Sequence, residues 1–319
     1  MKLSDAVNVY VDRLRLDPSR STHTIRSRAS DLRKFMRHHR DTLLRSVSSS
    51  MIQTYFGKLI HEEHFAPVTV LRHWSTLKSF FHFCIGEGTI DRSPLSGIHL
   101  PVKAELQPPV VLSKGEIRRM LMAPEKEIEK LKKELARRLH AGSKTEEVEK
   151  NLRESIRNRA VIELLFATGM RVGELVNLKV KDFNFHNNTV MIRLKKGAER
   201  LGYFPSDVVK SALREYLEQR KKLEFSSQTF YLNSRGDALQ QESVRKIVRK
   251  YADSAKIGKT VTPYTLRHSL VSLLLEAGTD IYAIQQIIGT SSNLMIQLVA
   301  RNKKQSLKSA LEKADPRKT

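Results

Sequence analysis

Apolar residues recur with the period of an α-helix in four stretches of the first hundred residues. Spacing of i, i+3, i+4 and i+7 gathers such residues into a stripe along one helix face. The four stripes are Val7, Tyr10, Val11 and Leu14; Ile25, Ala29, Leu32 and Met36; Ile52, Tyr55, Phe56, Leu59 and Ile60; and Val70, Trp74, Leu77, Phe81 and Cys84. We therefore predict a small basic four-helix bundle over residues 1–100, with its aromatic side chains packed in the core.

Residues that favour helix ends flank these stripes. Thr22 is a candidate cap for the second helix, and the serines at 48–50 are candidates for the third. Pro67 suits the first turn of the fourth helix, and Gly86 with Gly88 predicts its end.

Residues 101–112 are proline-rich and aperiodic, which predicts a linker. Ser113 and Glu116 have capping-box spacing, and the helix that they open is expected to end at Pro124. A charged insert follows at about 125–155, interrupted by Gly142 and restarted by a second predicted capping box, Ser143 with Glu146. Mixed charge at helical spacing favours a solvated helical hairpin, and a partner-binding arm is the alternative.

The remainder of residues 113–319 predicts a second domain. The apolar segment that starts at Val161 forms a helix ending at Gly169. VKDFNF, TVMIRLK and GYFP are predicted strands, joined by Asn187–Asn188 and by a turn around Lys196–Gly197. Further helices are expected at 206–222, 241–256, 263–277, 280–288 and 306–313. The fold class is therefore mainly α with a small antiparallel sheet (α+β).

Charge is the strongest global signal. The chain has 57 Lys and Arg against 34 Asp and Glu, so its net charge is 57 − 34 = +23. Such a potential attracts polyanions, which favours a nucleic-acid partner over a ribosomal or membrane-surface role. No apolar run is long enough to cross a membrane, and the single cysteine, Cys84, excludes an internal disulfide. We expect a cytoplasmic protein.

Three cations lie at the ends of predicted elements in the second domain: Arg171 after a helix stop, Lys196 in a turn and Arg267 at a helix start. Convergent cations stabilise the negative charge that develops on phosphate oxygens during phosphoryl transfer. A lysine at a turn can also protonate a leaving oxygen. Spacing alone leaves surface solubility as the alternative, because the chain has so many basic residues.

The segments around these cations resemble the tyrosine recombinases. ATGMRVGELVNLKVKD is similar to the first arginine motif of that family, and TPYTLRHSLVSLLLEAGTDIYAIQQIIGTSS to the second. HTIRSRASDLRKF and VTVLRHWSTLKSFFHFCIGEGTIDRSPL resemble the SAM-like core-binding domain of Xer-type recombinases and phage integrases, and SALEKADPRK resembles the final helix. The resemblance spans nearly the whole chain except the charged insert.

The resemblance implies residue roles in binding a DNA phosphate. Arg171 and Arg267 correspond to the phosphate clamp, Glu174 to the acidic residue, and Lys196 (or its neighbour Lys195) to the turn lysine. His268 stands in the usual LRHS string, where we favour a structural role. The resemblance implies no cofactor and no metal.

Three positions depart from the family pattern. Tyr264 stands where histidine is usual, and Thr290 where histidine or tryptophan follows the glycine. Val299 occupies the place of the tyrosine that attacks DNA, and no tyrosine occurs after Tyr282. A valine has no atom that could attack phosphorus, so no catalytic set is intact.

These departures favour a site-specific DNA-binding protein that takes part in recombination, integration or their regulation and does not cleave. One alternative is an active recombinase with an atypical nucleophile, and another is a non-specific nucleic-acid-binding protein. The expected partners are duplex DNA and an active tyrosine recombinase or a second copy of this chain. No membrane partner is expected, and the protein would be associated with the nucleoid.

Overall fold

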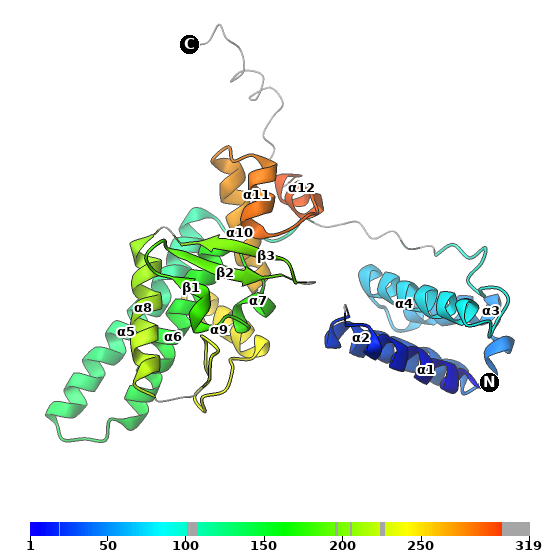
Figure 1. The fold of residues 1–319 in the computed structure, drawn as a ribbon, viewed down its shortest axis with the longest axis horizontal. Coiled ribbons are helices and arrows are strands. Elements are labelled where there is room, and N and C mark those ends of the chain that lie inside the picture. Colours follow the sequence, from blue (N-terminus) through cyan, green and yellow to red (C-terminus); the bar gives the residue numbers. More distant parts are fainter. Residues whose placement is uncertain are drawn as a thin grey trace, which may run out of the picture. The chain divides into compact units, whose positions relative to one another are not determined.

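The computed structural model describes residues 1–18, 20–100, 102, 108–194, 197–204, 206–223 and 227–301. It divides into two compact units, Met1–Leu106 and Gln107–Thr319 (Figure 1). The first unit is helical, and the second combines helices with one three-stranded antiparallel sheet. The predicted fold class, mainly α with a small antiparallel sheet, is confirmed.

The N-terminal unit is built from four α-helices whose predicted stripes form its core. The helical segments are α1 (Leu3–Leu16), α2 (Thr22–His39), η1 (Leu44–Ser46), α3 (Ser49–Gly57), η2 (Lys58–Glu62) and α4 (Pro67–Gly86). Val7, Leu32 and Leu77 are buried as predicted, while Trp74 is only half-buried. Ser21, one residue before the expected Thr22, caps α2 by accepting a hydrogen bond from the Thr24 amide.

A buried polar network joins α2, α3 and α4. The Tyr55 hydroxyl and His73 Nδ1 share a 2.8 Å hydrogen bond, and His73 Nε2 lies 3.4 Å from Asp31 Oδ1. The Thr76 hydroxyl donates to Asp31 over 2.9 Å, and Arg72 also pairs with this carboxylate. Burial lowers the pKa of His73, so the ring is neutral near pH 7.

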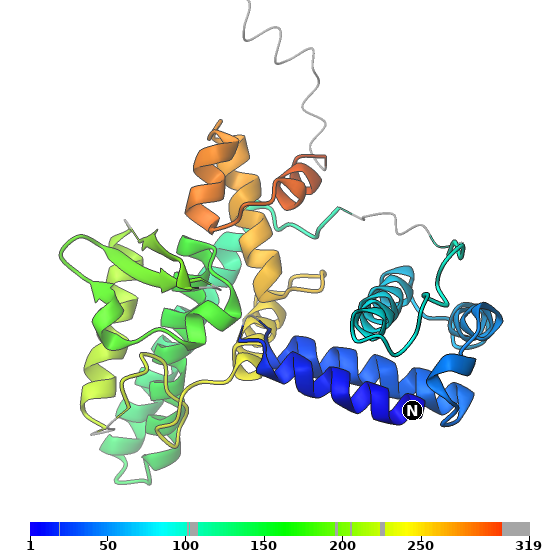
Figure 2. The same cartoon turned by 45° about the vertical axis from the view of Figure 1, so that its right-hand side comes forward.

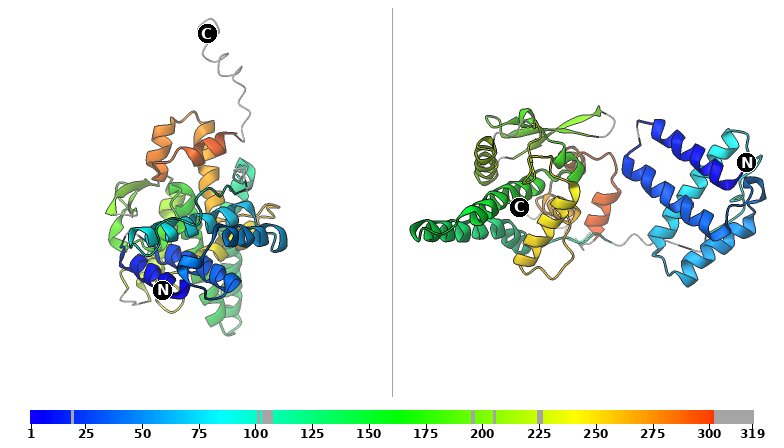
Figure 3. Two further views of the ribbon diagram at one scale, coloured as in Figure 1. Left: turned by 90° about the vertical axis from the view of Figure 1, so that its right-hand side faces the viewer. Right: turned by 90° about the horizontal axis from the view of Figure 1, so that it is seen from below.

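The charged insert forms the predicted helical hairpin, in which α5 (Lys114–His140) packs along α6 (Glu146–Thr168) (Figure 3). The prediction that the first helix ends at Pro124 is wrong, because α5 runs through this residue. A proline inside a helix costs about 3 kcal/mol. Burial of Ile117, Met120 and Ile128 on the same helix offsets that cost, since each buried side chain contributes roughly 1.5–3 kcal/mol.

The second predicted capping box is also wrong. Thr145, not Ser143, precedes α6, and its hydroxyl bonds Glu149 over 2.8 Å. Ser143 instead lies in the turn, where its amide donates to the Arg138 carbonyl. Gly142 does interrupt the helices as predicted, with a φ of 60° that suits glycine.

The sheet has the order β1–β2–β3, with strands Phe183–Asn184, Thr189–Arg193 and Glu199–Tyr203 (Figure 2). Two strand bounds differ from prediction. Residues Val180–Asp182 form a 3₁₀ turn (η3) rather than strand, and β3 begins at Glu199, before GYFP. Ile192 pairs with Arg200 and Val190 with Gly202, so these residues share one face of the sheet.

The remaining predicted helices are present, apart from the segment 306–313, which lies outside the described residues. They are α8 (Asp207–Lys221), α9 (Gln241–Ser254), α10 (Pro263–Glu276) and α11 (Ile281–Ile288). Two helices outside that list, α7 (Val172–Val176) and α12 (Leu294–Arg301), also form in the described residues. Helices α11 and α12 both pack on α10 (Figure 1). Four parts of this unit meet beside α10: the end of α6, the start of α7, β3 and the end of α11.

Candidate functional site

Two helix ends create a site that attracts cations. Helix α6 ends at Gly169 and α11 at Gly289, both in the left-handed conformation with φ of 57° and 65°. The last carbonyls of a helix lack partners within it and carry the negative end of its dipole. Carbonyls of Thr168, Gly169, Ile287 and Gly289 all accept hydrogen bonds from arginines.

Arg267 is the most deeply buried of these arginines. Its side chain leaves α10 and donates to the Gly169 carbonyl, and only 4% of the residue is exposed. Burial, reinforced by the nearby charge of Arg171, lowers the pKa of Arg267 to about 10, so it stays protonated at neutral pH. Arg267 is enclosed because α6 and α10 pack against each other over it.

Arg171 lies at the start of α7, where Glu174 holds it at two points. Its backbone amide donates to Glu174 Oε2 over 2.9 Å, and its guanidinium to Glu174 Oε1 over 2.7 Å. The guanidinium also donates to the Gly289 carbonyl over 3.2 Å. The Arg171 side chain is 37% exposed, so a ligand in solvent can reach it.

Arg200 on β3 is a third arginine that sequence reasoning missed. It donates to the carbonyls of Ile287 (2.6 Å) and Thr168 (3.4 Å), and lies 3.8 Å from Glu174 Oε2. Its side chain is 8% exposed, and burial lowers its pKa to about 10. Its Nε has no hydrogen-bond partner among the described residues.

A sequence signal for Arg200 did exist. Strand alternation places residues 200, 202 and 204 on the face that Gly202 and Phe204 bury. A charged residue is rarely buried without a partner, so an arginine at such an inward position indicates a functional or structural contact. The structure adds that Gly289 leaves room for this arginine, because a Cβ there would come within 2.5 Å of Arg200 Nε and would displace the side chain.

The cluster Arg171, Arg200, Arg267 and Glu174 has an unbalanced charge. Three guanidinium groups surround one carboxylate, which leaves 3 − 1 = +2. Buried charges are costly unless a counter-charge accompanies them. Guanidinium groups bind phosphate through paired N–H donors, so this arginine cluster is suited to a phosphate.

Three further predicted site residues lie beside this arginine cluster: His268, Tyr264 and Thr290. His268 follows Arg267, and burial together with the Arg267 charge lowers its pKa, which keeps the imidazole neutral at pH 7. Tyr264 is 53% exposed on the first turn of α10, with its ring centroid 6.4 Å from that of His268. Thr290 follows Gly289 at the end of α11, and its hydroxyl accepts from the Ser292 amide. Lys195 and Lys196 lie outside the described residues.

Val299 lies on the buried face of α12. It is 0% exposed and packs in an apolar cluster with Val271, Ile284, Ile288 and Ile296. The side chain at this position is therefore part of the packing between α10, α11 and α12. The serine hydroxyls that precede α12 are exposed, and that of Ser292 accepts from the Leu294 amide.

The described part of the chain contains no group of three or more His, Cys, Asp or Glu side chains placed to hold a metal ion. No helix within it is both long and apolar enough to cross a membrane.

Comparison with known proteins identifies the family. The model of the phage integrase family matches residues 129–305, and that of the phage integrase N-terminal SAM-like domain matches residues 7–88. The chain therefore belongs to the phage integrase family, that of the tyrosine recombinases.

Similar proteins extend over the same length. The tyrosine recombinase XerD of Staphylococcus epidermidis is 29% identical over 321 residues, covering 99% of this chain and all of the relative. XerC of Halalkalibacterium halodurans is 29% identical, with 98% of this chain and 97% of the relative covered.

Solved structures share the fold. XerH bound to a palindromic difH substrate gives a TM-score of 0.70 at 22% identity, covering 90% of this chain and 79% of that one. A λ integrase dimer bound to a core site gives 0.65 at 18% identity, with coverage of 94% and 77%.

Proposed function

We propose that this protein binds a specific duplex DNA site and holds a backbone phosphate in the arginine cluster without cutting the strand. Arg171 and Arg267 would bind the non-bridging oxygens, and Lys196 (or Lys195) would add a further cation. Glu174 positions Arg171 and Arg200, and the neutral His268 has a structural role. Residues 1–100 would supply further backbone contacts and part of the sequence selection.

The buried Val299 carries the non-cleaving part of this proposal. Attack on a phosphodiester needs a nucleophilic atom, and a valine has none. The side chain at 299 is enclosed in the apolar cluster, and the sequence has no tyrosine beyond Tyr282. Thr290 cannot supply the ring N–H of a histidine or tryptophan.

Such a protein would act on recombination through partners. It would bind DNA beside an active tyrosine recombinase or a second copy of itself and would regulate assembly or compete for the site. Structures that share this fold include a λ integrase dimer bound to a core site and a λ integrase tetramer bound to a Holliday junction. In this role the protein would be cytoplasmic and associated with the nucleoid.

A nicked suicide substrate tests the absence of cleavage, because the cut end diffuses away and any covalent protein–DNA adduct accumulates. We expect no adduct from the unmodified protein. Loss of a nucleophile costs on the order of 10⁶ in rate in a well-studied protease. The triple variant Val299→Tyr, Thr290→His, Tyr264→His should form some adduct, and Val299→Tyr alone very little. An adduct from the unmodified protein would overturn the proposal.

Tyr264 is the residue to examine if such an adduct forms. Its phenol is exposed beside Arg267, which favours it over the serines before α12 as an atypical nucleophile. Tyr264→Phe would then abolish the adduct while DNA binding remained. Adduct formation that survives this substitution would point to Ser291 or Ser292, and peptide mapping of the adduct would decide between them.

A further inference from the structure

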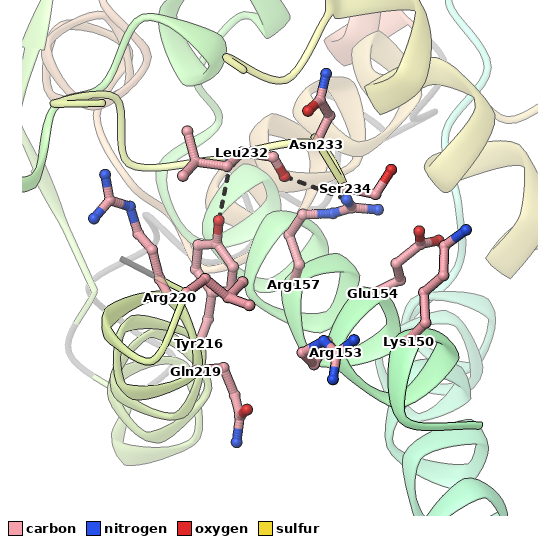
Figure 4. Close-up of a pocket in the computed structure, with 11 residues that line it drawn as sticks. Lys150, Arg153, Glu154, Arg157, Tyr216, Gln219, Arg220, Leu232, Asn233 and Ser234 are labelled. Carbon is pink, nitrogen blue, oxygen red and sulfur yellow. Dashed lines mark hydrogen bonds between the residues drawn. The ribbon is translucent and has the colours of Figure 1, made fainter. Parts of the chain in front are cut away.

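A second basic site lies away from the arginine cluster, in a cavity of about 350 Å³ between α6, α8 and the loop 232–234 (Figure 4). Lys150, Arg153, Arg157 and Arg220 line it together with one carboxylate, Glu154, which leaves 4 − 1 = +3. Arg157 precedes the end of α6 at Thr168 by eleven residues, about 16 Å of helix at 1.5 Å per residue. The two sites share no residue.

Arg157 is the central cation of this cavity (Figure 4). Its Nη1 donates to the Leu232 carbonyl over 3.2 Å, while Nε and Nη2 donate to Asn158 Oδ1 over 3.2 and 2.9 Å. These acceptors are neutral, and no carboxylate of the described residues forms a salt bridge with Arg157. Burial lowers its pKa, although the group stays charged at pH 7. One N–H remains on each terminal nitrogen, enough for a paired contact with an anion.

The neighbouring cations extend this charged wall. Lys150, Arg153 and Arg157 follow one another at i, i+3 and i+7 on α6, so they lie along one helix face. Among the described residues Lys150 has no ion pair, and Arg153 forms only a long contact of 3.7 Å with Glu149. Arg220, on α8, is partly engaged: its Nη2 donates to the carbonyls of Ser227 and Thr229, while its buried Nε has no hydrogen-bond partner among the described residues.

The rest of the cavity wall is apolar or neutral. Leu223, Leu232 and the ring of Tyr216 provide apolar surface, and the Tyr216 hydroxyl is already engaged with the Leu232 amide and the Phe230 carbonyl. Gln219 and Ser234 also line the cavity, and neither side chain is hydrogen-bonded within the described residues. The site therefore combines a strongly cationic side, an apolar surface and neutral hydrogen-bonding groups.

We propose that this cavity binds a nucleoside monophosphate. The phosphate would contact Lys150, Arg153 and Arg157, and the base and sugar would lie against Tyr216, Leu223 and Leu232. The volume lies at the lower end of the range for small-molecule sites, about 300–1,000 Å³. A phosphodiester of duplex DNA offers less charge and nothing to cover the apolar wall.

The chain's own C-terminal segment is a poor occupant of this cavity. Residues 302–319 carry six Lys and Arg against two Asp and Glu, a net charge of 6 − 2 = +4. A basic segment is repelled by a cavity of the same sign, so a second copy of the chain would not insert this segment here.

Calorimetric titration of the full-length protein with adenosine monophosphate tests the proposal. We expect one saturable site. Adenosine should bind at least about tenfold more weakly because it lacks the charge-assisted hydrogen bonds of the phosphate. Inorganic phosphate should also bind at least about tenfold more weakly because it leaves the apolar wall uncovered. Arg157→Gln should weaken binding to a similar degree. The double variant Lys150→Gln, Arg153→Gln should also weaken binding. Because it changes more exposed side chains, it tests the proposal even if Arg157→Gln disturbs folding.

Two matched controls separate this cavity from the arginine cluster and from general charge. Lys130→Gln with Lys133→Gln removes the same charge from exposed positions of α5 outside the cavity and should leave binding unchanged. Arg171→Gln should also leave it unchanged, whether or not the protein binds DNA. Loss of nucleotide binding in Arg171→Gln, inorganic phosphate binding as tightly as the nucleotide, or displacement of the nucleotide by duplex DNA would each overturn the proposal.

Discussion

Arg171 and Arg267 carry the same charge in different surroundings. The Arg171 guanidinium is partly in solvent, whereas Arg267 is enclosed and donates to the Gly169 carbonyl. Removing a buried donor leaves its acceptor unpaired, at a cost of about 1–3 kcal/mol. The two arginines should therefore differ in their effect on stability even where both contact phosphate.

Arg171→Ala is expected to weaken DNA binding about tenfold or more while leaving the melting temperature nearly unchanged, because a lost charge-assisted contact costs about 1.5–3 kcal/mol. Arg267→Ala should weaken binding and also lower stability. Thermal unfolding and DNA titration of both variants measure this difference. Arg171→Lys keeps the charge without the forked donor and should restore only part of the affinity. Unfolding of the Arg171→Ala variant would contradict the assignment.

Among the elements, helices α2, α3 and α4 are joined by the buried contacts of His73. Burial also lowers the pKa of His38 and His39 at the end of α2. A histidine with a folded-state pKa below its unfolded value of about 6.5 binds its proton more readily in the unfolded chain. The stability that it contributes is present above pH 6.5 and is lost as pH falls through the folded-state pKa.

The N-terminal unit should therefore lose stability between pH 7.5 and 5.5, by at most about 1.4 kcal/mol per pH unit for each such histidine. Trp74 is the single tryptophan and lies on α4, so its fluorescence during urea unfolding of the full chain follows this unit. His73→Gln should reduce the pH dependence, whatever its effect on stability at pH 7.5. An equal slope in both proteins would exclude His73 as a source.

At the scale of the whole molecule, the net charge of +23 determines how DNA affinity depends on salt. Lys and Arg that neutralise DNA phosphates release condensed counterions, so the binding constant falls as salt is added. Each neutralised phosphate contributes about −0.9 to the slope of log K against log salt. The specific site should retain an advantage over unrelated DNA at every salt concentration, because base contacts do not depend on counterion release.

Titration of duplex DNA at several salt concentrations should give a steep negative slope, and Arg171→Ala should reduce its magnitude by about one phosphate's contribution, 0.9. A slope near zero would exclude the nucleic-acid role. Equal affinity for all sequences would instead favour the alternative of a non-specific binding protein. A random-sequence selection followed by competition with the selected site distinguishes these outcomes.

Local chemistry explains which features could be predicted from the sequence. Period and end signals depend on neighbouring residues, so the helices of the bundle, the hairpin insert and the turns at Gly169 and Gly289 were predictable. The absence of a tyrosine after Tyr282 is a property of the sequence alone. No folding can restore a missing hydroxyl at position 299.

Only tertiary packing decided the features that depend on contacts between distant segments. Burial of Arg267, the place of Arg200 beside Glu174 and the enclosure of Val299 each require elements far apart in the chain to meet. Pro124 reads locally as a helix end, yet packing of α5 along α6 outweighs the lost hydrogen bond. The cavity beside Arg157 has the same origin, because its walls come from α6, α8 and a loop that are separate in sequence.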